Sequence, residues 1–199
     1  IFGSLDPETY IRHIKEFFMM VPKGNDKTGT AATISVTWSL VNQKPEAGLV
    51  LLAPSKEIAS RSFDYAAGII RADPVLEKLF YPPKTHTKLI EHRQTGASIK
   101  VVAADKGAAT GGKQTVTVVD ETHELSNNSQ AMGIMTEVRG AIGKSRDAFM
   151  LQITTQSKKP PSGLFKAELD KARAVRDGKL PLPILPILYE LPADLAKDG

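Results

Sequence analysis

Short runs of apolar residues alternate with amphipathic, helix-like segments along most of this chain, and this alternation constrains the fold more than any other feature. The runs have the length of buried strands, and the segments between them repeat their apolar residues at helical spacing. Strand-like runs cover 16–21, 49–53, 115–119 and 148–155, with weaker strand signals across 89–103; helix-like segments cover 27–41, 55–70, 131–143 and 162–176. Because strands that are apolar on both faces need helices on both sides, the pattern predicts an α/β fold with a mainly parallel central sheet.

The composition narrows the class of protein. The chain has 199 residues, of which 41% are hydrophobic and 24% charged, and its formal net charge is +4. No apolar run approaches the roughly 18 residues of a membrane-spanning helix, so we expect no membrane partner. The absence of cysteine excludes disulfides and cysteine-based zinc sites and fits a reducing cytosol. The charge is spread too evenly along the chain to indicate a nucleic-acid-binding arm.

The two ends of the chain suggest how it is organised. It does not begin with methionine, and its last part is rich in proline. We interpret the chain as a piece of a longer protein with one domain over residues 1–180. Residues 181–199 are predicted to be an exit segment or linker that contains at most one short strand.

Unusual polar residues follow three of the strand-like runs. Ligands of parallel sheets bind at the C-terminal ends of strands, so these positions are candidates for one site. After the first run, the segment from Pro22 to Thr28 supplies the lysine and the hydroxyl of a phosphate-binding loop at a helix start. It does not match the pattern G-x-x-x-x-G-K-[ST], because Val21 and Asp26 occupy the two glycine positions. By itself, this loop fits an ordinary strand-to-helix turn equally well.

The run 115–119 ends in two adjacent carboxylates, Asp120 and Glu121. Consecutive strand residues point in opposite directions, so one carboxylate could hold Mg²⁺ while the other polarises the water that attacks a γ-phosphate. The alternative is a surface acidic pair that favours a helix start. The buried character of the preceding strand favours the functional interpretation.

The third strand end carries Thr154 and Thr155, whose hydroxyl groups could sense the loss of a γ-phosphate. Taken alone, paired threonines usually reflect β-propensity. His123 and Glu124 follow the acidic pair, but no His-Glu-x-x-His pattern supports a metal cluster there. The chain has no G-x-S-x-G motif and no cysteine nucleophile, so we set aside hydrolases of those kinds.

Read in order, these motifs resemble the ATPase domain of the large terminase subunit of tailed bacteriophages. The resemblance spans nearly the whole chain. It rests on Val-Pro-Lys-Gly-Asn-x-Lys-Thr at 21–28, Leu-Ala-Pro-Ser-Lys-Glu at 52–57, Val-Val-Asp-Glu-Thr-His-Glu-Leu at 118–125, Ile-Thr-Thr at 153–155 and Pro-Ile-Leu-Tyr-Glu at 186–190. It implies a RecA-like, ASCE-type P-loop NTPase that uses ATP and Mg²⁺ to move viral double-stranded DNA into a procapsid.

The resemblance also implies a role for each motif residue. Lys27 would neutralise the β- and γ-phosphates, and Lys23 would follow the γ-phosphate. Thr28 and Asp120 would hold Mg²⁺, and Glu121 would be the catalytic base. Thr154 and Thr155 would form the coupling motif. The nucleotide-binding loop would consist of Pro22, Lys23, Gly24, Asn25, Asp26, Lys27 and Thr28.

Partners and location follow from the same resemblance. Family members act on double-stranded DNA with the portal protein of the procapsid and the small terminase subunit. They work in the host cytoplasm, docked transiently on the procapsid. We expect a pentamer-like ring when assembled, with a monomer as the alternative for the isolated domain. Family members continue into an RNase H-like nuclease domain, which lies beyond this chain.

Ring motors of this kind complete each site with a basic side chain from the neighbouring subunit. The candidates are Arg139, Arg146, Lys106 and Lys113. Arg146 is included among the predicted catalytic residues because it lies nearest to the coupling motif in sequence. A solvated surface charge is the alternative for each of them.

Asp26 departs from the family pattern, which has glycine before the lysine. Either the loop is rearranged so that Asp26 points away, or its charge faces the triphosphate and weakens nucleotide binding. Our hypothesis is that the isolated domain binds ATP weakly and hydrolyses it slowly. Two other functions stay open at this point. Asp120-Glu121-Thr122-His123 also fits a DExH-type helicase or translocase fragment. A degenerate, non-catalytic module that docks on a portal or on DNA is favoured by Asp26 and disfavoured by Glu121.

Overall fold

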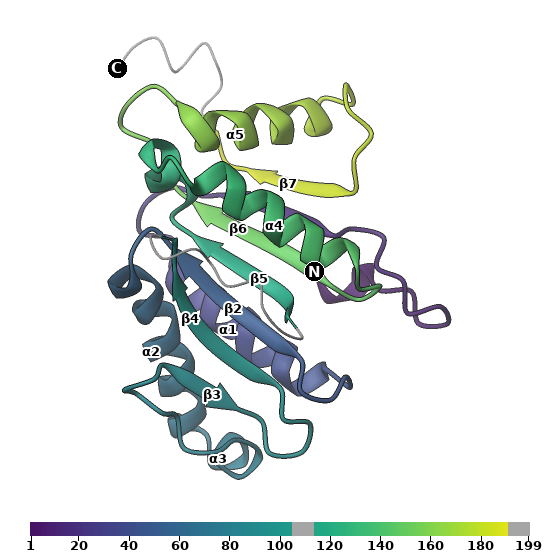
Figure 1. Cartoon of the computed structure of the whole chain (residues 1–199), viewed down its shortest axis with the longest axis vertical. Coiled ribbons are helices and arrows are strands. Elements are labelled where there is room, and N and C mark those ends of the chain that lie inside the picture. Colours follow the sequence, from purple (N-terminus) through teal and green to yellow (C-terminus); the bar gives the residue numbers. More distant parts are fainter. Residues whose placement is uncertain (105–113, 191–199) are drawn as a thin grey trace.

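A computed structural model of the chain describes residues 1–104 and 114–190, which are built around a seven-stranded sheet in the order β3-β4-β2-β5-β6-β1-β7 (Figure 1). The strands are β1 Glu16–Met20, β2 Gly48–Ala53, β3 Leu89–Glu91, β4 Ser98–Ala103, β5 Gln114–Asp120, β6 Phe149–Thr154 and β7 Ile184–Leu188. Every neighbouring pair is parallel except β3 and β4, which are antiparallel. The predicted α/β fold with a mainly parallel sheet is therefore confirmed.

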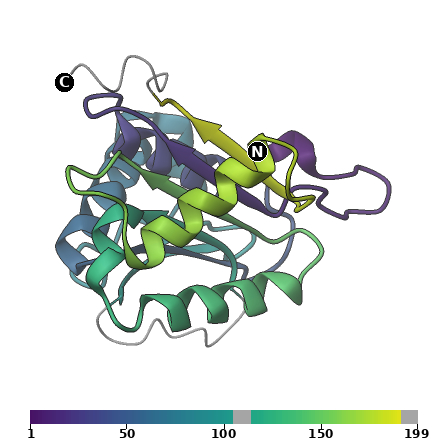
Figure 2. The same cartoon turned by 90° about the horizontal axis from the view of Figure 1, so that it is seen from above.

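Helices cover both faces of the sheet. They are α1 Lys27–Val41, α2 Lys56–Ala72, α3 Pro74–Leu79, α4 Ala131–Gly143 and α5 Gly163–Arg176. Helices α1 and α2 lie on one face and α4 and α5 on the other (Figures 1 and 2). The sequence analysis missed α3, although Asp73 caps it and Pro74 follows at its first position, which is a common start signal. Within residues 1–104 and 114–190, no helix is long and apolar enough to cross a membrane.

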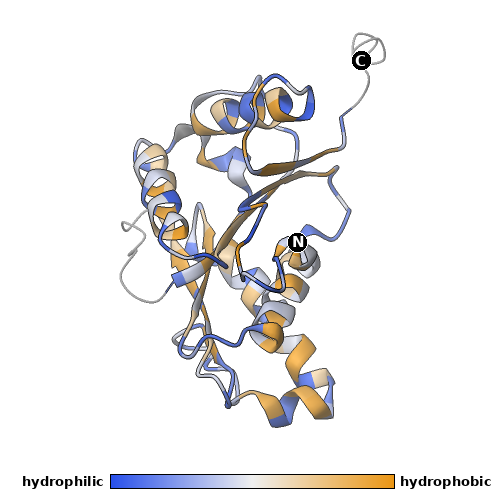
Figure 3. Ribbon diagram, turned by 90° about the vertical axis from the view of Figure 1, so that its right-hand side faces the viewer, coloured by the Kyte–Doolittle hydropathy of each residue, from blue (hydrophilic) through white to orange (hydrophobic). Residues whose placement is uncertain are grey.

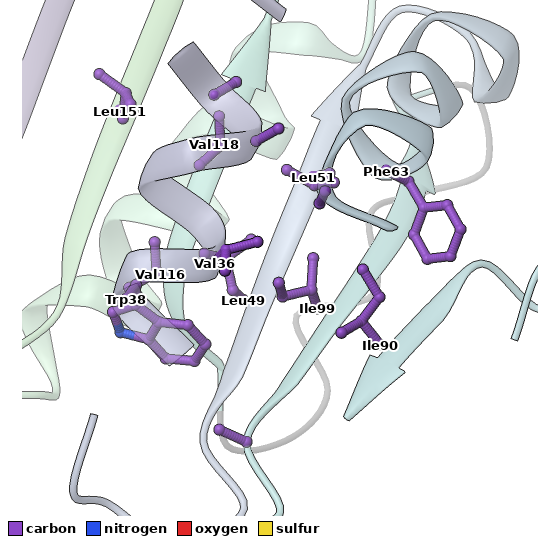
Figure 4. Packing of buried hydrophobic residues seen from close by; sticks show 14 of the residues in the cluster. Val36, Trp38, Leu49, Leu51, Phe63, Ile90, Ile99, Val116, Val118 and Leu151 are labelled. Carbon is purple, nitrogen blue, oxygen red and sulfur yellow. The ribbon is translucent and has the colours of Figure 1, made fainter. Parts of the chain in front are cut away.

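The core lies against the two faces of the sheet. On the larger side, residues such as Val36 and Phe63 of the helices pack on Leu49, Val118 and Leu151 of the strands (Figure 4). On the opposite side, α4 packs on β5 and β6, and α5 packs on β1. The strands are largely hydrophobic along their length (Figure 3). Because β5 and β6 are buried on both faces, the side chains at their C-terminal ends are held by a packed core.

Strand β7 is the one short strand that the sequence analysis allowed beyond residue 180. It lies inside the predicted exit segment, but it pairs in parallel with β1, from Ile184 opposite Glu16 to Leu188 opposite Met20. Pro186 is tolerated in this strand because β7 is at the edge of the sheet. The sheet thus continues past residue 180. Residues 191–199 lie outside the described part of the chain, so their role as a linker stays a prediction.

Candidate active site

The three strand ends named from the sequence meet at one edge of the sheet. Strands β5, β6 and β1 are adjacent and parallel, with Asp120 opposite Ile153 and Met20 opposite Thr154. The loop after β1, the acidic pair after β5 and the two threonines at the end of β6 therefore lie side by side. The two threonines, predicted to form a coupling motif, are in the middle of the three.

The loop after β1 turns through two residues in the left-handed region, Gly24 at φ 90° and Asp26 at φ 38°. Asp26 caps α1, because its Oδ1 accepts a hydrogen bond from the Gly29 N–H at 3.2 Å. The carboxylate covers Gly29 so closely that a Cβ there would lie 2.2 Å from Asp26 Oδ2. Asp26 thus folds back onto the first turn of α1 and occupies one of the N–H groups that an anion at this helix start would use.

The rest of the helix start is open. The backbone N–H groups of Lys27 and Thr28 and the Thr28 hydroxyl have no hydrogen-bond partner among the described residues. Free N–H groups at the start of a helix attract anions. The loop can therefore accept a phosphate even with the Asp26 cap in place. Lys23 is exposed in this loop, and its predicted contact with a γ-phosphate stays a prediction.

Lys27 faces the acidic pair. Its side chain is only 9% exposed, and its Nζ lies 4.0 Å from Glu121 Oε1. A buried ammonium needs an anion nearby, and here the anion comes from the strand end two strands away. The cation expected to hold phosphates and the carboxylate expected to act as a base are thus placed face to face.

Asp120 is buried at the end of β5. Its Oδ2 accepts a hydrogen bond from the Ser62 hydroxyl of α2 at 3.2 Å, and its Oδ1 accepts one from the Glu121 N–H at 2.9 Å. Burial, and then the charge of Glu121, raise the pKa of Asp120, while Ser62 and Lys27 act in the opposite direction. Ser62 was missed by the sequence analysis, although a hydroxyl on the apolar face of α2 beside Phe63 and Ala66 was the available signal.

Glu121 is held in an unusual backbone conformation, at φ 53° in the left-handed region. Such a conformation costs about 1–3 kcal/mol in a residue other than glycine, and it is often found at functional sites. Burial by itself raises the pKa of Glu121, but the contact from His123 and the charges of Lys27, His123 and Arg61 together lower it. The carboxylate is therefore ionised at neutral pH and able to accept a proton.

His123 connects this carboxylate to the coupling motif. Its Nδ1 lies 3.2 Å from Glu121 Oε2 and 3.1 Å from the Thr154 hydroxyl oxygen, which also accepts a hydrogen bond from the His123 backbone N–H at 3.1 Å. Thr154 is fully buried, and its hydroxyl donates to the Thr155 carbonyl at 3.2 Å. The sequence analysis considered His123 only as a metal ligand, whereas the structure places it between Glu121 and Thr154.

A glycine allows the segment that carries His123 to approach α5. The 3₁₀ turn Thr122–Asn127 packs on the start of α5, where Gly163 has φ 52°. A Cβ on Gly163 would lie 2.1 Å from the Ser126 carbonyl oxygen. The His123 ring also meets Phe165 of α5 edge-on, at 6.2 Å between ring centroids. The position of His123 is therefore fixed from two sides.

The residues present fit a magnesium ion that is shared with a phosphate. Thr28 offers an unpaired hydroxyl and Asp120 a carboxylate, and Mg²⁺ is usually bound by one or two protein oxygens together with phosphates and water. In the described residues, no group of three or more His, Asp or Glu side chains forms a ready metal site. A nucleotide would therefore complete the coordination.

Two arginines proposed as basic residues for a neighbouring site lie elsewhere. Arg139 bonds Glu16 through Nε and Nη2, both at 3.0 Å, and bonds Glu168 at 2.6 Å. It is therefore engaged inside the fold. Arg146 lies before the N-terminal end of β6, whereas Thr154 lies at the C-terminal end of the same strand. Arg146 borders a cavity of about 400 Å³ that is also lined by Trp38.

Arg146 is thus not brought together with the other site residues of its own chain. Its role in a neighbouring subunit's site stays a prediction. Lys106 and Lys113 lie outside the described residues.

Comparisons with known proteins identify the family and the fold of this chain. The family model "Terminase large subunit, ATPase domain" matches residues 1–172. The chain is similar in structure to the large terminase of bacteriophage HK97, with a TM-score of 0.75 and 21% identity over 91% of this chain and 36% of that one. For the large terminase of the thermophilic bacteriophage D6E, the TM-score is 0.60 with 12% identity over 93% of this chain and 44% of that one.

The large terminase ATPase domain of Thermus phage P74-26 gives a TM-score of 0.56 with 14% identity over 74% of this chain and 62% of that one. At these identities the structural matches establish the RecA-like terminase ATPase fold alone. This chain spans less than two thirds of the length of each of these chains. A search of the curated proteins finds no match.

Proposed function

Because this chain belongs to the family of terminase large subunit ATPase domains, we propose that it hydrolyses ATP with Mg²⁺ and that hydrolysis powers the movement of viral double-stranded DNA into a procapsid. One observation carries the proposal. Lys27, at the start of α1, faces Glu121 at 4.0 Å, next to the buried Asp120. The groups that would hold the phosphates, bind the metal ion and act as the base thus lie at one edge of the sheet, and this arrangement supports ATP hydrolysis.

Each residue of the site has its own role in the proposed reaction. Lys27 and the free N–H groups of α1 hold the terminal phosphates, while Thr28 and Asp120 would hold Mg²⁺. The metal ion would neutralise charge on the phosphate oxygens. Glu121 orients the attacking water and accepts its proton. The water oxygen bonds to the γ-phosphorus while the bond between the γ-phosphorus and the leaving group breaks. The leaving group is ADP.

The test is phosphate release by the 199-residue chain in the presence of Mg²⁺ and in the presence of a chelator. Mg²⁺-dependent release supports the proposal, and its absence at every nucleotide concentration would favour the non-catalytic docking module. A DNA-unwinding assay distinguishes the packaging motor from the DExH-type helicase. A helicase unwinds the strands of a DNA duplex, whereas a packaging motor leaves them paired. The portal, the small subunit, the ring and the cytoplasmic location are proposals that follow from the family.

His123 is proposed to position Glu121 and to report on the state of the site to Thr154. We expect His123→Ala to lower kcat by about 10- to 100-fold with little change in KM, because a base displaced by a fraction of an ångström loses its alignment with the water. His123→Asn should recover part of the rate, since its amide can donate from near the Nδ1 position. Steady-state ATP hydrolysis measures both.

The exposed His86 supplies the matched control, and His86→Ala should leave both constants unchanged. The positioning role is contradicted if His123→Ala raises KM at constant kcat, or if the asparagine variant is no better than the alanine variant.

Asp26 is proposed to weaken nucleotide binding, since its carboxylate holds the Gly29 N–H and adds negative charge beside the phosphates. We expect Asp26→Gly to bind ATP about tenfold more tightly. Removing the negative charge of Asp26 from beside the phosphates is worth about 1–2 kcal/mol at an effective dielectric near 20. Glycine adopts the left-handed conformation of this position without strain. Calorimetric titration with Mg–ATP measures the affinity.

The control is Asp73→Gly, which removes an equivalent carboxylate cap from α3, away from the site. It should leave the affinity unchanged. Equal, micromolar binding of ATP by the wild type and by Asp26→Gly would refute this role of Asp26.

A further inference from the structure

The cavity of about 400 Å³ beside Arg146 lies where β6 begins, at the end of the sheet opposite the candidate active site. Helix α1 connects the two places, because it starts at Lys27 in the phosphate-binding loop and ends at Val41, which lines the cavity. At about 1.5 Å per residue, this 15-residue helix separates them by about 22 Å. The cavity is therefore distinct from the place where a nucleotide would bind.

The wall of the cavity is largely apolar. Phe2 and Leu5 line it from the N-terminal segment, and Trp38 and Val41 line it from the last turn of α1. Trp38 packs into the core (Figure 4), whereas Val41 is 55% exposed. Tyr10, which also lines the cavity, is 57% exposed. Exposed apolar side chains around a cavity of this size indicate a site for a partner with an apolar surface.

Arg12 is a buried cation at this cavity that lacks an ion pair. The residue is only 6% exposed, and its Nε and Nη1 donate to the carbonyl oxygens of Asp147 and Ile1 at 2.9 and 2.8 Å. One face of the guanidinium covers the Phe149 ring. Among the described residues, Nη2 has no hydrogen-bond partner and the guanidinium forms no ion pair. Burial lowers the pKa of Arg12, and the charge of Asp147 opposes this only in part. A buried charge needs an anion, so the free Nη2 is a place for an acidic group.

Two exposed cations lie beside Arg12. The Arg12 backbone N–H donates to the Arg146 carbonyl at 3.0 Å, and Lys44 Nζ donates to the Ser145 hydroxyl oxygen at 3.2 Å. Neither Lys44 nor Arg146 forms an ion pair with a described residue. Among the described residues that line the cavity, Asp147 is the only carboxylate, and its Oδ1 already accepts from the Ser145 hydroxyl at 2.7 Å. Three cations against one carboxylate make the cavity attractive to an anion.

We propose that this cavity docks a short segment of a partner protein in which an acidic side chain is flanked by apolar ones. The carboxylate binds Arg12 Nη2, with Lys44 and Arg146 beside it, and the apolar side chains pack on Trp38. A protein segment fits better than a free small anion, because more than half of Tyr10 is exposed and offers apolar contact to a larger partner. The proposal does not depend on the proposed ATPase function.

The test follows the fluorescence of Trp38, the only tryptophan of the chain, while the 199-residue chain is titrated with the peptide acetyl-Leu-Glu-Leu-Phe-amide. We expect saturable binding. Replacing the glutamate of the peptide by glutamine should weaken it about tenfold, because hydrogen bonds between charged groups are stronger than those to a neutral amide. Mg–ATP should not compete, since its proposed site lies at the other end of α1.

Substitutions of exposed residues test the site without disturbing the fold. Lys44→Glu and Arg146→Glu should each weaken peptide binding about tenfold, because each replaces an attraction by a repulsion. Val41→Ser should weaken it about threefold through lost apolar contact. The matched controls are Lys78→Glu and Val75→Ser, at exposed positions of α3, and both should keep wild-type affinity.

Three results would overturn the docking site. The first is equal binding of the glutamate and glutamine peptides, or of neither. The second is wild-type affinity in both Lys44→Glu and Arg146→Glu. The third is competition by Mg–ATP, which would place the peptide at the candidate active site. None of these results bears on Mg²⁺-dependent phosphate release, so the ATPase proposal is tested separately.

Discussion

Replacing Glu121 by glutamine is expected to lower the rate of phosphate release by about 10²- to 10⁴-fold, the range that a positioned general base contributes. The amide cannot accept the proton of the attacking water. ATP binding should be retained or become tighter, because Lys27 loses the carboxylate that faces it at 4.0 Å and is left with the phosphates as its anionic partner. Hydrolysis and equilibrium binding, measured on the same preparation, separate the two effects.

Glu124 provides the matched control for this prediction. It is an exposed carboxylate on the same 3₁₀ turn, and Glu124→Gln should leave the rate unchanged. A Glu121→Gln variant that keeps a tenth or more of the wild-type rate would show that another group is the base. Loss of ATP binding together with activity would assign Glu121 to binding instead.

Replacing Arg139 by alanine is expected to destabilise the fold by about 3 kcal/mol, without a specific effect on the chemistry. Arg139 of α4 bonds Glu16 of β1 and Glu168 of α5, and Glu168 is buried and also accepts from Gln152 Nε2 at 2.8 Å. Alanine would leave the Glu168 carboxylate with Lys171 as its remaining cationic partner. Thermal unfolding should show a decrease in Tm of about 6–12 °C for a chain of this size.

The ion pair of Arg139 and Glu168 should make the stability of the fold decrease at acidic pH. Burial raises the pKa of Glu168, but the hydrogen bond and charge of Arg139, with Lys171 and Gln152, lower it overall. The stabilisation from Glu168 is therefore present above its ordinary pKa of 4.5 and is lost as the pH falls toward its lower pKa in the folded state. Arg139→Ala should reduce this acid dependence.

The exposed Arg71 of α2 is the control for the arginine substitution, and Arg71→Ala should change Tm by less than about 2 °C. A wild-type Tm for Arg139→Ala would contradict the structural role. A variant that is fully stable but inactive would return Arg139 to the group of candidate catalytic cations.

The sequence predicted the fold and the meeting of the strand ends because both depend on local patterns. Apolar runs of strand length, separated by helical segments, require a parallel sheet, and a parallel sheet brings the ends of β1, β5 and β6 to one edge. The loop and the acidic pair therefore lie at one edge as expected, and their roles stay predictions, since the loop lacks both of its expected glycines.

What the sequence did not predict depends on contacts between distant segments. Ser62 reaches Asp120 from 58 positions away, and His123 reaches Thr154 across 31. Arg139 was considered as a free cation because its partner Glu16 is 123 positions away. No periodicity in the chain encodes such pairs.

Backbone geometry explains the remaining differences. The sequence left two arrangements open for Asp26, and its left-handed conformation and the missing side chain of Gly29 let it fold back onto α1. The Pro-rich stretch around Pro186 suggested a linker with at most one short strand, and β7 is that strand, since an edge strand accepts proline.

Equilibrium binding of Mg–ATP to Lys27→Ala and Glu121→Gln, each compared with the wild type, tests most directly whether this edge of the sheet is one nucleotide site. The account predicts that Lys27→Ala loses binding, because the phosphates lose their buried cation, and that Glu121→Gln binds at least as tightly as the wild type. Binding of ATP by Lys27→Ala with wild-type affinity would contradict it.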